Sequence, residues 1–261
     1  MIISDKQYDM EGYIGNYYYK SPYLYLNLLK YGATGGPVAT YRQIINNNTT
    51  CVLLKYHKTL HILSKNDASV NVREVLSLFN SLGCNMLCGS GEIIDRLYSI
   101  ADKGEFAIEM GNTRELSSIE PEPNREDIRA VRGDDLLAVA HIVCKDKIFS
   151  SACTEDELYR QIRSRNDEGY SRNYVLEADG KIVAHAGTGA ENDEMAIITH
   201  VIVDPDYRRR GYAFRILRAL CSDLIAEGKK CYLINYTEAS TNLYDKLGFK
   251  LKCRYGRCYR K

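Results

Sequence analysis

A strand, a basic turn and a helix follow one another between residues 195 and 226, and this segment constrains the fold more than any other. The apolar run Met195–Val203 predicts a strand that stops at Asp204-Pro205, because proline has no N–H to donate to a sheet. Three arginines and Gly211 follow. Apolar residues then recur with helical spacing at Phe214, Leu217, Cys221, Leu224 and Ile225. The first N–H groups of such a helix attract an anion, and glycine permits its close approach. The segment therefore predicts an anion-binding loop; the alternative is a solvated basic turn.

The spacing Arg208-x-x-Gly211-x-Ala213 after Val-Asp-Pro resembles the acyl-CoA pyrophosphate loop of the GNAT N-acetyltransferase superfamily. The resemblance implies acetyl-CoA as co-substrate and no metal. It implies that the loop binds the pyrophosphate, through Arg208, Arg209, Arg210, Gly211, Tyr212 and Ala213. It also implies that backbone N–H groups of the preceding strand orient the thioester, at Val201, Ile202 and Val203. Asn235, at the end of a later strand, is a further candidate for a cofactor contact.

A candidate acid lies in the segment Asn242-Leu-Tyr-Asp-Lys-Leu-Gly-Phe249, which is similar to a GNAT segment whose tyrosine protonates the departing thiolate. This assigns the acid role to Tyr244. A phenol with a pKa near 10 and a thiol near 8.5 are close enough for proton transfer. The alternative is that Tyr244, one of 21 tyrosines, only packs through its ring.

The general base is not evident from the sequence. Many relatives carry a glutamate midway along the strand before the loop, where this chain has Ile197. Glu194 and His200 are the remaining candidates, although Glu194 also suits a solvated turn. His200 also suits a core position, because it shares a face with Ile198 and Ile202 on a regular strand. A water chain as base, or acyl-CoA binding without catalysis, is compatible with the same residues.

Composition excludes several classes of function. The 261 residues carry a net charge of +1, so no global field recruits nucleic acid. No apolar run reaches the ~18 residues needed to cross a membrane, and the first twenty residues lack the apolar core of a secretory signal. The nine cysteines, an odd number in apolar surroundings, favour reduced thiols over disulfides. These features predict a cytoplasmic protein with no nucleic-acid or membrane partner.

The order of predicted elements repeats along the chain. Helix, three strands, helix, strand, helix and strand are expected between Tyr23 and Met110, and β-α-α-β-β-β-α-β-α-β from Ile128 onward. The second order is that of the GNAT fold, and the first resembles it with an eroded start. We therefore expect an α+β fold with α/β/α layers and a mixed, mostly antiparallel central sheet. The expected domains are a degenerate GNAT-like domain at 1–119, a linker at 120–127 and a catalytic domain at 128–261.

The first half lacks the anion-binding loop, because Lys65-Asn-Asp-Ala-Ser-Val70 contains neither glycine nor arginine. Three other motifs have structural explanations. Gly89-Ser-Gly91 before a helix resembles a dinucleotide loop, but its third glycine is Ile94. The pairs Cys84/Cys88 and Cys253/Cys258 lack zinc-site spacing. The basic tail 250–261 is expected to be an edge strand.

These features predict an N-acetyltransferase that moves an acetyl group from acetyl-CoA to a primary amine of a small molecule, by direct attack in a ternary complex. The alternatives are a protein lysine or N-terminal acetyltransferase, and a non-catalytic acyl-CoA-binding module. A homodimer is possible through the first half.

Overall fold

The computed structural model describes residues 1–33, 35–145 and 154–261, which pack as two compact units. The first unit consists of Met1–Arg114, Ile234–Glu238 and Leu251–Lys261. The second consists of Glu115–Leu233 and Ala239–Lys250. The packing boundary thus falls at 114/115 instead of in the expected linker at 120–127, and the last strand packs with the first unit.

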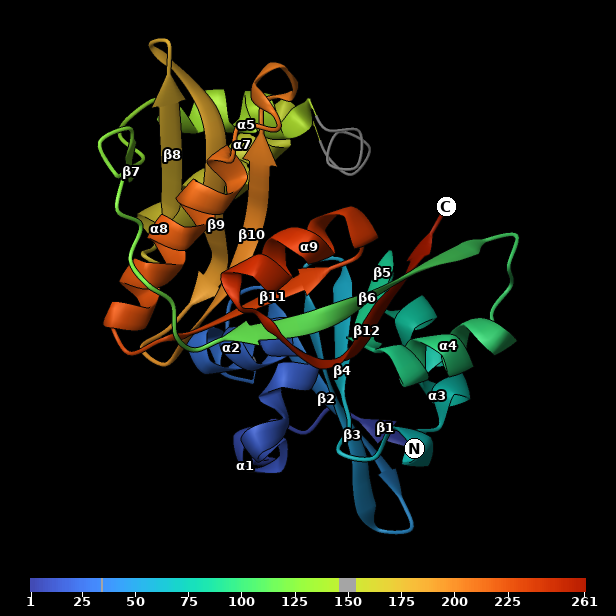
Figure 1. Cartoon of the computed structure of the whole chain (residues 1–261). Coiled ribbons are helices and arrows are strands. Elements are labelled where there is room, and N and C mark those ends of the chain that lie inside the picture. The colour runs from blue at the N-terminus through green and yellow to red at the C-terminus, as the bar shows by residue number, and fades with distance from the viewer. Residues whose placement is uncertain (34, 146–153) are drawn as a thin grey trace. The chain divides into compact units, whose positions relative to one another are not determined.

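The first unit has the strand order β1-β2-β3-β4-β5-β12-β6 (Figure 1). Its strands are β1 (Ile2–Ile3), β2 (Val38–Ile45), β3 (Asn48–Tyr56), β4 (Thr59–Leu63), β5 (Met86–Ser90) and most of β6 (Phe106–Leu116) and β12 (Lys250–Arg260). Its helices are α1 (Met10–Ile14), α2 (Pro22–Tyr31), α3 (Val72–Ser81) and α4 (Gly91–Ile100), with short 3-10 helices η1 (Gly15–Lys20) and η2 (Asp67–Ser69). The recorded pairs are antiparallel except β4 with β5. Helices α3 and α4 cover one apolar core, and α1 and α2 another.

The second unit has the strand order β11-β10-β9-β8-β7, in which only β10 and β11 pair in parallel. The strands are β7 (Ile128–Ala130), β8 (Asn173–Ala178), β9 (Lys181–Glu191), β10 (Met195–Val203) and β11 (Lys230–Asn235). The helices are α5 (Asp135–Cys144), α7 (Glu155–Asp167), α8 (Tyr212–Ala226) and α9 (Glu238–Leu247), with η3 (Pro205–Tyr207) after β10. Figure 1 shows α8 across one face of the strands and α5 with α7 on the other. Each face has its own apolar core.

The predicted fold class and the order of elements in both halves are confirmed. Local signals identified the turns correctly. Asp179 and Gly180 have φ of 54° and 70°, as the predicted two-residue hairpin between β8 and β9 requires. Thr154 forms the predicted capping box with Glu157 at the start of α7.

Two predictions about strands were wrong. The strand expected to end at Met110 continues to Leu116 as β6. The basic tail is no edge strand, because β12 lies between β5 and β6 and pairs with β5 from Tyr255↔Ser90 to Tyr259↔Met86. Tyr255 and Cys258, on its two faces, are both 1% exposed. Arg257 between them is paired with Glu109.

Candidate functional site

The start of α8 has N–H groups that meet no acceptor in the described part of the chain. Gly211 is the N-cap and has φ of 81°, which glycine adopts readily and other residues rarely do. The first hydrogen bond of the helix runs from the Arg215 N–H to the Gly211 carbonyl at 3.1 Å. The N–H groups of Tyr212, Ala213 and Phe214 precede it and have no partner within the helix. Their donors and the helix dipole make this end of α8 suitable for an anion.

Side-chain contacts of Asp204 and Arg208 stabilise the loop between β10 and α8. The Asp204 carboxylate accepts from the Asp206 N–H at 3.1 Å and pairs with Lys145 at 2.7 Å. This ion pair holds the pKa of Asp204 below its usual range. The Arg208 Nε donates to the Val203 carbonyl at 3.2 Å, and Arg209 takes a positive φ of 65°. These contacts fix the backbone of the turn from β10 into α8.

Helix α3 holds the corresponding place in the first unit, and a side chain caps its first N–H groups. The Asn71 side chain accepts from the N–H groups of Arg73 and Glu74 at 3.2 and 3.4 Å. Arg96 donates to the carbonyls of Asp67 and Val70 in the preceding loop. The donors that are open at α8 are thus occupied at α3. This agrees with the prediction that residues 65–70 do not form an anion loop.

A β-bulge interrupts β10 just before the loop. Between the pairs Thr199↔Gly187 and Ile202↔His185, β10 advances three residues while β9 advances two. His200 takes a φ of 49°, and the recorded pairing of β10 with β9 resumes only at Ile202. On the other side of β10, the recorded pairing with β11 ends at Ile197↔Tyr232.

The bulge changes which face each residue occupies. Ile198 belongs to the core under α8, whereas Ile202 belongs to the core under α5 and α7. The expectation that His200 shares one face with both was therefore wrong, because the extra residue shifts the alternation by one.

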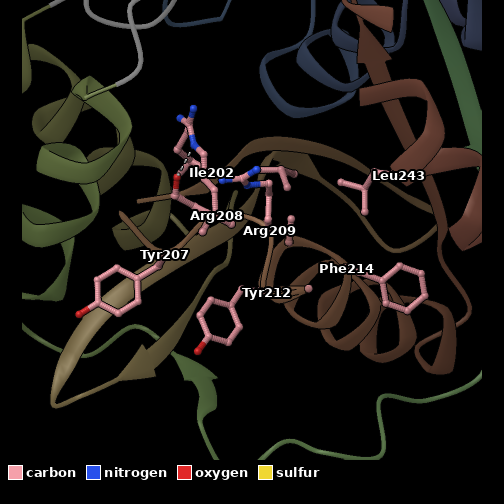
Figure 2. Close-up of a pocket in the computed structure, with 11 residues that line it drawn as sticks. Ile202, Tyr207, Arg208, Arg209, Tyr212, Phe214 and Leu243 are labelled. Atoms are coloured by element: carbon pink, nitrogen blue, oxygen red, sulfur yellow. Dashed lines mark hydrogen bonds between the residues drawn. The ribbon is translucent and has the colours of Figure 1, made fainter. Parts of the chain in front are cut away.

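A pocket of about 520 Å³ lies where the bulged strand meets the start of α8 (Figure 2). Its walls are Val201, Ile202, Val203, Tyr207, Arg208, Arg209, Gly211, Tyr212, Ala213, Phe214 and Leu243. Figure 2 shows Tyr207 on one side of the pocket and Phe214 with Leu243 on the other. The volume is in the range typical of small-molecule sites. One pocket thus combines open N–H donors, arginine side chains and aromatic surface, which suits a phosphate-bearing ligand with an apolar part.

Most of the residues predicted to bind the cofactor line this pocket. Arg210 does not, and its guanidinium lies 5.0 Å from the centre of the Tyr207 ring. Asn235 is also outside the lining. It is 5% exposed, and its Oδ1 accepts from Arg114 Nε at 3.0 Å within the first unit.

Tyr244 follows the lining residue Leu243 in α9 but is not itself among the lining residues. Its ring packs edge-on against Phe249, with 5.8 Å between ring centres. Its carbonyl accepts from the Phe249 N–H at 3.0 Å. Both the acid role and the packing role remain compatible with this position.

Neither Glu194 nor His200, the two predicted candidates, is well placed to act as a general base. Glu194 is exposed just before β10, and Val201, the first pocket residue of that strand, lies seven positions later, about 23 Å along an extended strand. Burial lowers the pKa of the His200 imidazole to about 3, with nearby His185 and Arg165 as smaller causes. Such a ring is neutral at pH 7 and is a weak base.

Two contacts were missed by the sequence analysis, one between two side chains and one between a side chain and the backbone. Tyr232 donates a short hydrogen bond to the Glu115 carboxylate, and Tyr232 is directly paired with Ile197. His185, fully buried, contacts the backbone of the bulge. No sequence signal identifies the first pair, since 117 positions separate its members.

The glycines at 89 and 91 have packing roles. A Cβ at Gly91 would lie 2.6 Å from Arg254 Cγ, and one at Gly89 would lie 2.5 Å from Ile62 Cγ2. The helix that follows is capped by Ser90. Within the described residues, no cluster of three His, Cys, Asp or Glu side chains could hold a metal, and no helix has the length and apolarity to cross a membrane.

Part of the chain matches a known protein family and a curated relative. Residues 136–249 match the model of the acetyltransferase (GNAT) family. UPF0039 protein C11D3.02c from Schizosaccharomyces pombe is 37% identical over 78 residues, which cover 29% of this chain and 51% of that protein. The chain thus spans about half the length of this curated relative.

Two solved structures share the fold along the whole chain. An acetyltransferase of the GNAT family from Colwellia psychrerythraea has a TM-score of 0.58 at 14% identity, and all of both chains is covered. A tandem GNAT protein from the clavulanic acid biosynthesis pathway has a TM-score of 0.53 at 12% identity, with 100% of this chain and 98% of that chain covered. At such identities the likeness concerns the fold alone, and it confirms the expected tandem resemblance.

Proposed function

Residues 136–249 of this chain are an acetyltransferase domain of the GNAT family, and from this premise we propose the reaction and its substrates. The chain transfers an acetyl group from acetyl-CoA to a primary amine of a small molecule, by direct attack in a ternary complex. The observation that carries the proposal is the open start of α8 next to a bulged strand within one pocket.

The α8 start binds the pyrophosphate of acetyl-CoA. The N–H groups of Tyr212, Ala213 and Phe214 donate to its oxygens, and Gly211 allows the backbone to come close. Arg208 and Arg209, which line the pocket, add charge-assisted contacts. The aromatic residues Tyr207 and Phe214 provide apolar surface for the rest of the cofactor.

The bulge orients the thioester. Val201 lines the pocket and has no recorded partner residue on either side of β10, so its N–H is suited to receive the thioester carbonyl oxygen. A donor placed where negative charge develops lowers the barrier, and loss of one such donor costs about 10²–10³ in rate. Ile202 and Val203 complete this wall.

Tyr244 serves as the acid that protonates the departing thiolate. Its position next to Leu243, a lining residue on α9, supports this role. The step breaks the carbon–sulfur bond, forms the carbon–nitrogen bond, and moves one proton from the phenol to the sulfur.

The amine must lose a proton before or during attack, since an alkylamine has a pKa near 10.4. The carboxylate of Glu115, bonded to Tyr232, is the base candidate that the structure adds. Tyr232 is paired with Ile197, at the position where many relatives carry a glutamate. A water between the amine and this pair would carry the proton.

Mixing the protein with acetyl-CoA and a panel of small amines tests the proposal by thiol release. Turnover with at least one small amine supports it. Turnover only with peptides that present lysine or a free N-terminus supports a protein acetyltransferase. Acetyl-CoA binding without turnover on any acceptor leaves a non-catalytic binding module.

The first unit is proposed to provide structure or to mediate dimerisation, because its helix α3 has no open start. A cytoplasmic location, with no nucleic-acid or membrane partner, remains part of the proposal. The eight cysteines in the described part of the chain carry free thiols, six of them buried, as in reducing compartments.

A further inference from the structure

The bulge in β10 depends on a residue in an uncommon backbone conformation. His200 has φ of 49° in the middle of a strand, and residues other than glycine adopt a positive φ uncommonly. Such a conformation persists only where its surroundings hold it. The contacts around His200 therefore determine whether the bulge keeps its shape.

His185 on β9 makes the side-chain contact to this position. Its Nδ1 lies 2.8 Å from the His200 carbonyl oxygen, and its Nε2 lies 3.0 Å from Asn173 Oδ1. The side chain is 0% exposed, and Asn173, on β8, is 3% exposed. Asn173 in turn contacts Asn166 on α7 at 3.3 Å. A row of polar side chains, buried at His185 and Asn173 and partly exposed at Asn166, thus runs from the bulge to a helix.

The protonation state of His185 follows from this environment. Burial lowers the pKa of its imidazole to about 4, so the ring is neutral at pH 7 and carries one N–H. A carbonyl only accepts, so the proton is on Nδ1 and is donated to His200. The Nε2 contact then requires the Asn173 amide to be turned with its nitrogen toward the ring. The Asn166 amide must be turned as well, so that its N–H meets the Asn173 oxygen.

The atoms next to this contact belong to the pocket. The peptide unit whose carbonyl accepts from His185 continues into the N–H of Val201, because the peptide group is planar. Fixing the His200 carbonyl therefore fixes the direction of the Val201 N–H. Val201 lines the pocket beside the open start of α8.

We infer that His185 is a positioning residue for acetyl transfer, which holds the His200–Val201 peptide so that the Val201 N–H faces the thioester carbonyl. The inference rests on the proposed function. His185 does not contact the substrate and acts through the peptide group. It therefore affects the rate of the chemical step more than the binding of acetyl-CoA, whose pyrophosphate is bound at the α8 start.

Two variants of His185 and one matched control test this inference. His185→Leu removes the donor, and His185→Asn keeps an N–H close to the position of Nδ1. His61→Leu is the control, because His61 is 6% exposed, is held neutral by burial with a pKa lowered to about 4, and lies in the first unit. Both leucine variants change a buried imidazole, but only one of them affects the bulge.

The measurements are kcat, KM and the Kd of acetyl-CoA at equal folded fraction. We expect kcat of His185→Leu to fall about tenfold to a hundredfold, while the Kd of acetyl-CoA changes less than about threefold. His185→Asn should recover most of kcat, and His61→Leu should keep the wild-type value. Equal kcat in the two leucine variants, or equal loss in His185→Leu and His185→Asn, would overturn the inference.

Amide NMR separates this inference from the proposed function. Acetyl-CoA should shift the Val201 N–H resonance in the wild type and in His61→Leu, and this shift should be lost in His185→Leu. An inactive wild type that shows this pattern would refute the reaction and leave the positioning role intact. A Val201 shift that survives in His185→Leu would refute the positioning role even if the wild type turns over.

Discussion

Gly211→Ala is the perturbation that tests the anion loop most directly, and the chain provides a matched control at the other end of the same helix. Gly211 and Gly228 flank α8 with φ of 81° and 85°. A Cβ built on either glycine meets no atom within 4 Å. The two substitutions therefore add the same methyl group in the same backbone conformation without a clash. They differ only in the end of the helix that they affect.

The expected loss of stability is the same for both variants. A non-glycine residue in the left-handed region costs about 1–2 kcal/mol, so each variant should melt a few degrees below the wild type. The consequence for binding differs. Relaxation of the strained loop at Gly211 turns the first N–H groups of α8 away from the pocket. A ligand that binds only the original conformation then loses about 5–30-fold in affinity, the equivalent of 1–2 kcal/mol.

Calorimetric titration with acetyl-CoA and thermal melts of the three proteins provide the measurement. The reasoning holds if both variants lose similar stability while only Gly211→Ala loses affinity. It fails if Gly211→Ala binds acetyl-CoA as tightly as the wild type despite its lower melting temperature. It also fails if Gly228→Ala loses affinity to the same degree, because the effect would then come from general loosening of α8.

Three further predictions concern the chemistry and the buried histidines. Tyr244→Phe should lower kcat about 10²-fold or more with little change in the Kd of acetyl-CoA, whereas Tyr98→Phe on α4 of the first unit should not; equal activity of both would leave Tyr244 with packing alone. Glu115→Gln should lower kcat at neutral pH. The difference in kcat between this variant and the wild type should shrink as pH rises toward 10, where the amine deprotonates unaided; an unchanged pH–rate profile would argue against Glu115 as base. Burial depresses the pKa of His185 and His61 from 6.5 to about 4, so unfolded chains bind protons that the folded state excludes. Stability should therefore be complete above pH 6.5 and fall by about 1.4 kcal/mol per pH unit for each histidine down to about pH 4, and each His→Leu variant should flatten this slope in acid-denaturation curves.

The turn from β10 into α8 could be predicted because its signal is local. A strand, a proline, arginines and a glycine before a helical pattern lie within about 30 residues, and each has one main structural effect. The resulting pocket contains Arg208, Gly211 and Ala213 as expected. The same holds for the Asp179-Gly180 turn and the Thr154 cap, which depend on three or four adjacent residues.

Features that depend on distant partners could not be predicted. The bulge at His200 is stabilised from β9 by His185, and strand alternation alone put Ile198 and Ile202 on the same face. The tail was taken for an edge strand because its arginines looked solvated, yet Arg257 is paired with Glu109 at a separation of 148 residues. Pairing of β12 with β5 decides this, and no pattern within the tail itself encodes it.

The starts of α8 and α3 differ in whether side chains occupy their first N–H groups. Replacing an asparagine N-cap by glycine costs only a few tenths of a kcal/mol, so α8 gives up little stability by starting at Gly211. As a result, no side chain caps the first N–H groups of α8 at the positive end of its dipole. At α3 the Asn71 side chain takes two of these donors, and Arg96 takes two carbonyls of the loop before it. Removing Asn71 alone would still leave Arg96 in the loop. The open start of α8 therefore depends on side chains that are absent from its loop as much as on those present.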